Sequence, residues 1–322
     1  MYVSIKNNLY CLIIFRFNFF CVVRYTYSYR TICFQASNDK NLMLRHIKQL
    51  FAFFFIAFIM AILAAASIYY VLAPQLAPAE TLKEIQLQVP LRVYSAEGLL
   101  LAEFGDKRRI PVKYPQIPAQ LVYAFLASED DRFFEHPGVD YQGLLRAVYS
   151  LVMTGQKAQG GSTITMQLAR NFFLSSKKTY LRKLNEIILA LKIEHVLTKE
   201  EILTLYLNKI YLGKRAYGIG AAAKVYYGKS LEELSLPEMA MIAGLPKAPS
   251  RYNPIANPER AEQRRNYVLR RMSEVGYITE QAYNDAVQIP VTARYHSREI
   301  EVYAPYVAEI IRTELTEQYG GE

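Results

Sequence analysis

Cysteine is almost absent from this chain of 322 residues, and its three cysteines, Cys11, Cys21 and Cys33, all precede residue 43. The rest of the chain can therefore hold neither a disulfide framework nor a cysteine-ligated metal site. A body without cysteine suits an oxidising compartment but does not require one. Internal repeats and low-complexity tracts are also missing from the sequence.

The composition is that of a folded protein, since 52% of the residues are hydrophobic and 21% are charged. This excludes wholesale disorder, and the length allows one or two domains with a sizeable core. The formal net charge of +9 suggests an anionic partner, which could be a phosphate group, a nucleic acid or a membrane surface. Nucleic-acid binding is disfavoured because the basic residues are spread along the chain without a binding motif.

A charge-free run of 24 residues occupies positions 50–73. About 20 apolar residues suffice to cross a bilayer as a helix, so this run predicts one transmembrane helix. A buried core helix would be shorter and carry a polar edge, and the hydrophobic core of a signal peptide is also shorter. Arg45 and Lys48 precede the run, which predicts a cytoplasmic N-terminus. Tyr69 and Tyr70 would then lie near the outer interface.

Residues 1–42 differ from the rest, being rich in Phe, Tyr, Cys and Asn without a clean period. A short basic stretch follows Met43, so we interpret Met43 as the natural start and the preceding residues as a start-site artefact or a disordered extension. The alternative is a genuine extension with a weak hydrophobic patch over 11–23. Arg16 and Asn18 interrupt that patch and argue against a membrane span there.

The pattern of the body predicts a mainly α-helical fold with a small β entrance. Two short strands are predicted before residue 119 and helices after it, two of them opened by capping boxes at Thr198 and Ser235. The predicted elements are strands Leu91–Tyr94 and Leu99–Phe104, and helices from Leu121, over Thr179–Leu197, from Thr198 to Leu212, over Met239–Leu245, and from an Asn257 cap with Pro258 at the first position to Met272. After Pro290 the pattern weakens.

Glu129 continues an apolar helix face, because Leu121, Phe125 and Glu129 are spaced by four residues. The apolar stripe thus runs into the polar cluster EDDRFFEHPG at 129–138. Desolvation there should raise the pKa of Glu129, as a general base or acid near neutral pH requires. The alternative is an acidic surface patch at a helix end, which the following Phe-Phe and His-Pro-Gly make less attractive.

A second segment, QGGSTITMQLARN at 159–171, has two glycines and hydroxyl residues before a helical stretch. Such a turn can present backbone N–H groups to an anion. Gln167 and Arg170 lie one turn apart on the predicted helix. A flexible loop with an ordinary helix cap explains this segment alone equally well.

A third segment brings Arg182, Lys183 and Glu186 to one helix face by their spacing. The spacing alone favours a simple surface ion-pair helix, worth a few tenths of a kcal/mol per pair. The functional alternative is a cationic cradle for a diphosphate with an acidic group beside it, since the planar fork of arginine suits phosphate.

Together these segments resemble glycosyltransferase family 51, the peptidoglycan polymerase domain of class A penicillin-binding proteins, with closest likeness to its 1A branch. The resemblance covers residues 85–290. It is carried, in the family's order, by EDDRFFEHPG, GGSTITMQLARN, RKLNEI, KEEILTLYLNKIYLG, AYGIGAAAKVYYGK and AMIAGLPKAPSRYNP. The organisation that follows is an extension or artefact at 1–42, a cytoplasmic basic stub at 43–49, the membrane helix at 50–73, a linker with strands at 74–118, the glycosyltransferase domain at 119–290 and the start of a truncated linker at 291–322.

The resemblance implies a lysozyme-like helical domain that joins lipid II units and releases undecaprenyl diphosphate. By position, Glu129 matches the family's general base and Glu186 its second glutamate, beside the donor diphosphate. Basic residues matching those that steady the diphosphate are Arg170, Arg182 and Lys183. Polar donor-site positions match Ser162, Thr163, Gln167 and Asn171. Positions that shape the cleft around the base match Asp130, Phe133 and His136.

The same resemblance implies partners and a location. The partners would be lipid II, the growing glycan strand, the lipid bilayer and cell-wall synthesis proteins. The chain would span the cytoplasmic membrane once, with its catalytic domain on the outer side. A divalent cation, Mg²⁺ or Mn²⁺, is implied at the donor diphosphate near Glu186, although the sequence has no independent metal motif.

One departure from the full-length family concerns its transpeptidase domain. The segment SSKK at 175–178 fits S-x-x-K but lies inside the transferase region, and S-x-N and K-T-G are missing. We therefore expect a truncated chain without transpeptidase activity. Two alternative functions remain: a muramidase-like lytic enzyme, since the lysozyme-like fold is shared, and a catalytically inactive membrane scaffold.

Overall fold

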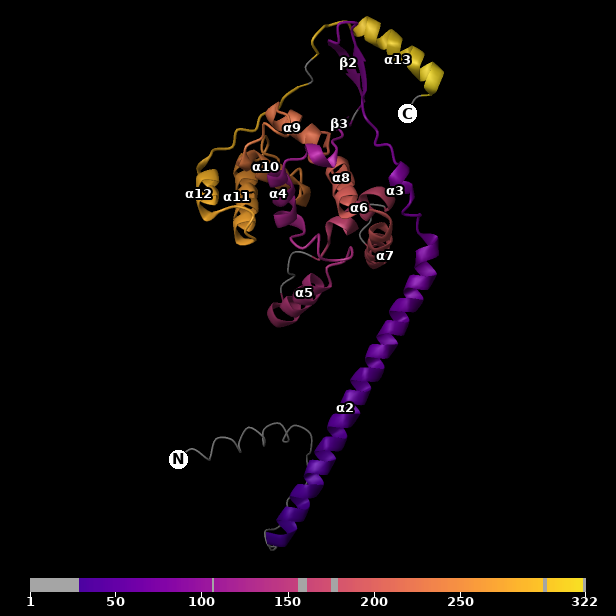
Figure 1. Cartoon of the computed structure of the whole chain (residues 1–322), viewed down its shortest axis with the longest axis vertical. Coiled ribbons are helices and arrows are strands. Elements are labelled where there is room, and N and C mark those ends of the chain that lie inside the picture. Colours follow the sequence, from indigo (N-terminus) through magenta and orange to yellow (C-terminus); the bar gives the residue numbers. More distant parts are fainter. Residues whose placement is uncertain (1–28, 106, 156–160, 175–178, 298–299, 321–322) are drawn as a thin grey trace. The chain divides into compact units, whose positions relative to one another are not determined.

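The computed structural model describes residues 29–105, 107–155, 161–174, 179–297 and 300–320. The chain divides into two compact units, Met1–Ile68 and Tyr69–Glu322, and each is described by itself. Figure 1 shows their helices and strands.

The first unit is dominated by helix α2 (Tyr29–Leu72), the long indigo helix of Figure 1. Within the described residues, the segment Lys48–Gln75 is the one stretch long and apolar enough to cross a bilayer, and none of its most apolar window is buried. The helix predicted at 50–73 is therefore confirmed as a helix. Because α2 begins at Tyr29, residue 43 does not mark a helix boundary. The patch considered at 11–23 lies outside the described residues.

The second unit is mainly helical, and two short sheets accompany the helices. The helices are α3 (Thr81–Glu84), α4 (Ala119–Glu129), α5 (Tyr141–Thr154), α6 (Ile164–Phe173), α7 (Tyr180–Val196), α8 (Lys199–Lys209), α9 (Ile219–Tyr227), α10 (Leu236–Gly244), α11 (Pro258–Glu274), α12 (Glu280–Gln288) and α13 (Pro305–Tyr319), with 3-10 turns η1 (Ala73–Gln75), η2 (Tyr114–Gln116) and η3 (Leu245–Lys247). Strands β1 (Leu91–Tyr94) and β2 (Leu100–Phe104) pair antiparallel, and β3 (Arg108–Arg109) and β4 (Ala216–Tyr217) pair parallel. The predicted mainly α fold with a small β part is confirmed.

The local signals in the sequence give most of these boundaries. The capping boxes at Thr198 and Ser235 are both formed, with Glu201 and Glu238 completing them. One predicted end is wrong: α8 stops at Lys209 rather than at residue 212. Gly218 N donates to Ile210 O at 2.7 Å, which turns the chain into the β4 segment instead of another helical turn.

Asn257 is the N-cap residue of α11 and Pro258 its first residue, as predicted. The Asn257 side chain does not bond to the helix, however; its amide donates to Ser250 O at 3.3 Å.

The weak pattern after Pro290 concealed helix α13, which packs against β2. The segment before α13 is also bound to β2, since Glu301 N and Val302 N donate to Leu100 O at 2.9 and 3.3 Å. Ala308 is the one buried residue of α13, and the apolar side chains of Tyr306, Val307, Ile310 and Tyr319 are exposed, so no single apolar face marks this helix in the sequence.

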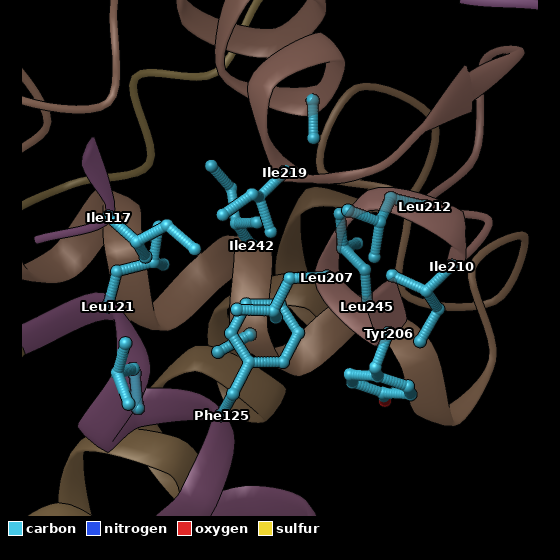
Figure 2. Close-up of a cluster of buried hydrophobic side chains, with 14 of the residues drawn as sticks. Ile117, Leu121, Phe125, Tyr206, Leu207, Ile210, Leu212, Ile219, Ile242 and Leu245 are labelled. Carbon is cyan, nitrogen blue, oxygen red and sulfur yellow. The ribbon is translucent and has the colours of Figure 1, made fainter. Parts of the chain in front are cut away.

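The core of the second unit is built around α4. Helices α10 and α11 pack on α4, and α6 packs on both α7 and α8. Phe125 and Tyr206 meet edge to face with ring centroids 6.3 Å apart, and both side chains are fully buried. Figure 2 shows this cluster, in which the labelled residues are Ile117, Leu121, Phe125, Tyr206, Leu207, Ile210, Leu212, Ile219, Ile242 and Leu245. The last residue of α4 is Glu129, so the packed core fixes the position of that carboxylate.

Removing the aromatic ring at the centre of this core should destabilise the domain. We expect Phe125→Ala to lower the free energy of unfolding by about 3–5 kcal/mol, because it deletes a fully buried ring and leaves a cavity. Denaturant unfolding of the full chain in detergent, followed by circular dichroism, measures the loss. Tyr306→Ala on α13, where the side chain is 82% exposed, is the control and should change little. Equal effects of the two variants would contradict this account of the core.

Candidate active site

A cavity of about 510 Å³ opens where α4 ends. Its walls come from α4, α5, α6, α11, η3 and the loops that follow α4 and precede α6. Charged side chains dominate the lining, and they are Glu129, Asp130, Asp131, Asp140, Arg146, Arg170, Lys247, Arg264 and Arg271. An excess of charge in one concave site points to an ionic ligand or to acid–base chemistry.

Glu129 lies in this cavity with only 11% of its side chain exposed. Gln167 Nε2 donates to Glu129 Oε2 at 2.9 Å, and Arg264 Nη2 lies 3.6 Å from Glu129 Oε1. Burial raises the pKa of Glu129; the Gln167 hydrogen bond, and then the charges of Arg264, Lys247 and Arg170, oppose the rise without cancelling it. The predicted raised pKa is thereby confirmed. A carboxylate in this state can accept a proton near neutral pH.

Gln167 is itself held in place from beneath. Tyr206 Oη donates to Gln167 Oε1 at 3.3 Å, so the amide nitrogen of Gln167 is directed at Glu129. An ionised carboxylate can only accept, so it is the amide nitrogen of Gln167 that faces Glu129. A chain of contacts thus leads from the core of α8 through α6 to the carboxylate at the end of α4.

Asp130, the neighbouring carboxylate, is bound in the protein rather than free for a ligand. Its oxygens accept from His136 Nε2 at 2.9 and 3.1 Å and from Ile164 N at 2.9 Å. Gly138 N donates to His136 Nδ1 at 3.2 Å, which places the ring proton on Nε2, where it is donated to Asp130. Asp130 therefore fixes the loop after α4 to the start of α6.

Phe133 and His136 lie beneath the cavity and not on its surface. Phe133 is fully buried, and its ring meets that of His136 at a centroid distance of 6.3 Å. Lys199 Nζ lies 4.4 Å from the centre of the Phe133 ring and donates to His136 O at 2.6 Å. These residues support the loop that carries Asp130 and Asp131. Sequence reasoning gave no role to Lys199, although it opens a predicted helix.

In the first turn of α6, the backbone N–H groups of Ile164 and Met166 are already bound to oxygens of the protein. Thr163 caps the helix by accepting from Met166 N at 3.2 Å, and Ile164 N is bound to Asp130. These backbone donors are satisfied within the protein because Asp130 reaches them from the loop after α4. Ser162, Thr163, Gln167 and Arg170 do line the cavity, whereas Asn171 does not. Residues 159 and 160 lie outside the described part.

Arg182, Lys183 and Glu186 form the ion cluster that their spacing allows. Glu186 Oε2 lies 3.1 Å from Lys183 Nζ, and Glu186 Oε1 lies 3.4 Å from Arg182 Nη1. The Glu186 side chain is only 2% exposed, whereas Arg182 and Lys183 are 18% and 37% exposed, so a buried carboxylate is paired with two partly exposed cations. Lys183 also donates to Ser162 Oγ at 2.6 Å, which connects the cluster to the cavity wall. None of the three residues lines the cavity directly.

Sequence reasoning missed several cations that the fold brings to Glu129. Arg264 is buried on α11, donates to Gly244 O at 3.2 Å and lies against the Tyr267 ring at 4.6 Å. The signal was present, because Arg264 occupies an apolar stripe four residues before buried Val268. A charged residue at a core position needs a partner, and here the partner is a carboxylate. Further cations without a sequence signal are Arg146, Lys247 and Arg271.

Comparison with known proteins identifies this architecture. Residues 97–273 match the family model described as transglycosylase. The chain belongs to the transglycosylase family. The family resemblance of its motifs is thereby confirmed.

Several relatives of this transglycosylase are penicillin-binding proteins 1A. The protein from Pseudomonas aeruginosa is 53% identical over 261 residues, which is 81% of this chain and 32% of that protein. The Escherichia coli K12 protein is 52% identical over 271 residues, 83% of this chain and 32% of that protein. A crystal structure of penicillin-binding protein 1A from Haemophilus influenzae covers 74% of this chain with 26% of its own, at 36% identity and a TM-score of 0.42. The chain spans about a third of the length of the curated relatives it matches.

The raised pKa of Glu129 predicts a pH-dependent cost to folding. A carboxyl whose pKa is higher in the folded state contributes its full stability only below the pKa of the unfolded chain, and that contribution is lost as the pH rises through the folded value. Glu129→Gln cannot ionise, so this variant should unfold at a higher temperature than the parent at pH 7.5. The difference should shrink towards about pH 4, the ordinary carboxyl range.

Thermal unfolding of both proteins across this pH range is the measurement. Glu232→Gln, which changes an exposed glutamate between α9 and α10, is the matched control and should show no such trend. A Glu129→Gln protein that is less stable than the parent at pH 7.5 would contradict the inferred burial cost.

Proposed function

We propose that this transglycosylase polymerises lipid II into β-1,4-linked glycan strands and releases undecaprenyl diphosphate. The observation that carries the proposal is a single desolvated carboxylate, Glu129, in a cavity bordered by cationic side chains. One base and several cations are what an inverting transfer with a diphosphate leaving group requires. The family and the penicillin-binding protein 1A relatives support the same reaction.

Glu129 acts as the base in this proposal. It takes the proton from the acceptor's 4-hydroxyl as that oxygen forms a bond to the donor's anomeric carbon. The bond from that carbon to the diphosphate oxygen breaks at the same time, and the diphosphate leaves with the electron pair. A single displacement inverts the linkage from α to β. The raised pKa keeps Glu129 basic enough to accept the proton.

The leaving diphosphate is stabilised by cations on the α6 and α7 side. Arg170 lines the cavity, and Lys183 reaches its wall through Ser162. Glu186 holds Lys183 and Arg182 together by its two oxygens, so we assign it the role of orienting these cations. Pre-arranged charges of this kind stabilise negative charge as it develops, without reorganising during the reaction.

A divalent cation at the donor diphosphate, Mg²⁺ or Mn²⁺, would meet one protein carboxylate in this cluster. That carboxylate is Glu186, whose buried Oε1 has no hydrogen-bond partner among the described residues. One carboxylate together with phosphate oxygens and water is a usual ligand set for Mg²⁺. A bound cation would add positive charge at the leaving diphosphate, beside Arg182 and Lys183.

A lytic function is less well supported by this site. Hydrolysis by two carboxylates needs a carboxylic acid that protonates the leaving sugar oxygen. Asp130 is bound to His136 and Ile164, and Asp131 lies 3.0 Å from Arg271. Asp140 pairs with Arg132, and its pKa is lowered: burial alone would raise it, but hydrogen bonds from Gly143 and Arg132 outweigh that effect. The lowered pKa of Asp140 makes it a poor acid, and the oxygens of Asp130 and Asp131 are engaged by other side chains. A diphosphate, in contrast, leaves without needing an acid.

The lipid substrate explains the apolar helix. We propose that Lys48–Gln75 spans the cytoplasmic membrane once, with its N-terminus inside and the second unit outside. Arg45 and Lys48 on the N-terminal side support this orientation. The bilayer then delivers lipid II to the site, and cell-wall synthesis proteins are the expected protein partners.

The central test is polymerisation of lipid II by the full chain in detergent. Glu129→Gln should reduce turnover by at least about 10²-fold, because it removes the base while the cavity and its cations remain. Glu232→Gln is the matched control and should retain parental activity. Glycan products are measured by gel electrophoresis. Product from the parent alone supports the proposal, and near-normal turnover by Glu129→Gln would refute the assignment of the base.

A parallel incubation separates the two alternatives. Release of soluble sugar from finished glycan by the parent would indicate a lytic enzyme. A folded parent that neither polymerises nor releases sugar would indicate a scaffold. Both readouts use the same protein preparation, so folding is checked once by circular dichroism.

The pH dependence of the reaction tests the environment of the base. Gln167→Met removes a hydrogen bond that lowers the pKa of Glu129, so that pKa should rise further. The acid limb of kcat/KM should move to higher pH, because a base works only when deprotonated. Gln281→Met, an exposed glutamine on α12, is the matched control. An acid limb unchanged in Gln167→Met would show that Glu129 does not govern the profile.

A further inference from the structure

A second cavity, of about 410 Å³, lies at the short β3–β4 sheet. It is lined by Arg108, Lys214, Arg215 and Tyr295, and we call these four residues the basic cavity. Three of the four carry a permanent positive charge. None of them lines the cavity around Glu129, so the two sites share no residue.

The ends of α8 mark the separation of the two sites. Lys199 at the first position of α8 binds the loop below the active-site cavity, through His136 O. Lys209 is the last residue of α8, and its pKa is lowered by burial and then by the charges of Arg109 and Lys107, which flank Arg108 in the sequence. An α-helix of 11 residues is roughly 16 Å long, so the basic cavity lies at the far end of the domain's central helices.

The side chains of the basic cavity converge on one aromatic ring. Arg108 Cζ lies 5.4 Å and Lys214 Nζ 5.9 Å from the centre of the Tyr295 ring. Arg108 also donates to Tyr295 Oη at 3.0 Å and to His296 O at 3.1 Å, which fixes the orientation of its guanidinium. Two cations are therefore held close together around a hydroxyl group that can itself donate.

Within the described residues, no carboxylate forms an ion pair with Arg108 or Lys214. The surroundings add positive charge, since Lys107 and Arg109 flank Arg108 in the sequence. Burial, and then the charges of Arg109 and Lys107, lower the pKa of Lys209. The buried Nε of Arg109 has no hydrogen-bond partner. Like charges held this close repel one another, and an anion bound between Arg108 and Lys214 would relieve that repulsion.

The backbone holds two of these cations in an unfavourable conformation. Lys214 and Arg215 have φ of 47° and 62°, the left-handed region that ordinary side chains rarely adopt. The turn is fixed by Ala216 N donating to Gly213 O at 2.8 Å and by Arg108 N donating to Arg215 O at 2.9 Å. Two glycines or asparagines would fit here with less strain. Strained positions that persist are often functional.

We propose that the basic cavity binds a phosphate group. A phosphate carries up to two negative charges and several acceptor oxygens, which match Arg108, Lys214 and the Tyr295 hydroxyl better than a single carboxylate does. The group could belong to a phospholipid headgroup or to a soluble phosphate compound. The inference is independent of the proposed polymerisation, since it involves none of the residues of that site.

The test compares the full chain in neutral detergent with an Arg108→Gln, Lys214→Asn double variant. Pyrophosphate is titrated calorimetrically, and glycerol 3-phosphate serves as a second soluble probe. The active-site cavity is also cationic, so the parent should show two classes of site and the double variant one. In the double variant, the affinity of the basic cavity for pyrophosphate should fall at least about tenfold, as expected for the loss of a charge-assisted contact. Equal binding by parent and double variant would overturn the proposal.

Two controls keep this result specific. Lys83→Gln with Arg260→Gln removes two exposed cations elsewhere and should bind like the parent. Lys214→Asn alone guards against misfolding, because asparagine tolerates the left-handed backbone better than lysine. This single variant should also lose affinity. A competition experiment tests for an acidic peptide as the ligand. If hexaglutamate displaces pyrophosphate from the basic cavity at a lower concentration than glycerol 3-phosphate does, the cavity is an acidic-peptide site and the proposal is overturned.

Native mass spectrometry identifies the source of the phosphate. The protein is incubated with phosphatidylglycerol in the same detergent, and the bound lipids are counted. One more lipid on the parent than on the double variant would show that the cavity takes a headgroup. Equal lipid counts together with a lost pyrophosphate class would show that it takes a soluble phosphate compound. Either result supports a phosphate site.

Discussion

The burial of the Glu129 carboxylate is the constraint on which the site depends. Glu129 ends α4, and most residues of α4 between Leu121 and Ala127 are buried in the core. The desolvation of Glu129 therefore follows from the packing of this helix. Gln167 and Arg264 compensate the charge only in part, and the pKa stays raised. Each compensating group comes from a different helix, α6 and α11. The packing of these helices against α4 therefore sets the basicity of the carboxylate as well as the stability of the domain.

Adjacent carboxylates take different tasks because their surroundings differ. Asp130 follows Glu129 directly, yet it accepts hydrogen bonds from His136 and Ile164, whereas Glu129 faces the cavity. Asp130 thereby joins the loop after α4 to the first turn of α6, and the same helix supplies Gln167. The positioning of Gln167 against Glu129 thus relies on Asp130 as well as on Tyr206. Pairs of carboxyl groups separated in this way are a common means of assigning chemical roles.

Local features of the structure could be predicted from the sequence, and long-range ones could not. The capping box at Thr198 and the helix face of Glu129 depend on residues within four positions, so their patterns are visible. Arg264 is 135 positions from Glu129 (264 minus 129), and only folding brings the two together. The bond between Asp130 and the first residue of α6 could not be predicted for the same reason, because Asp130 reaches Ile164 across 34 positions.

The net charge of +9 left the anionic partner open, and the structure separates its cations into two groups. Around Glu129, several cations are paired with carboxylates, as in Arg271 with Asp131 and Arg264 with Glu129 itself. Such pairs hold their cations in fixed directions and moderate the local potential, which suits a site where charge must move during a reaction. At the basic cavity, Arg108 and Lys214 lack carboxylate partners among the described residues, which suits holding an anion at rest. The two sites therefore differ less in their number of cationic side chains than in whether carboxylates are paired with those side chains.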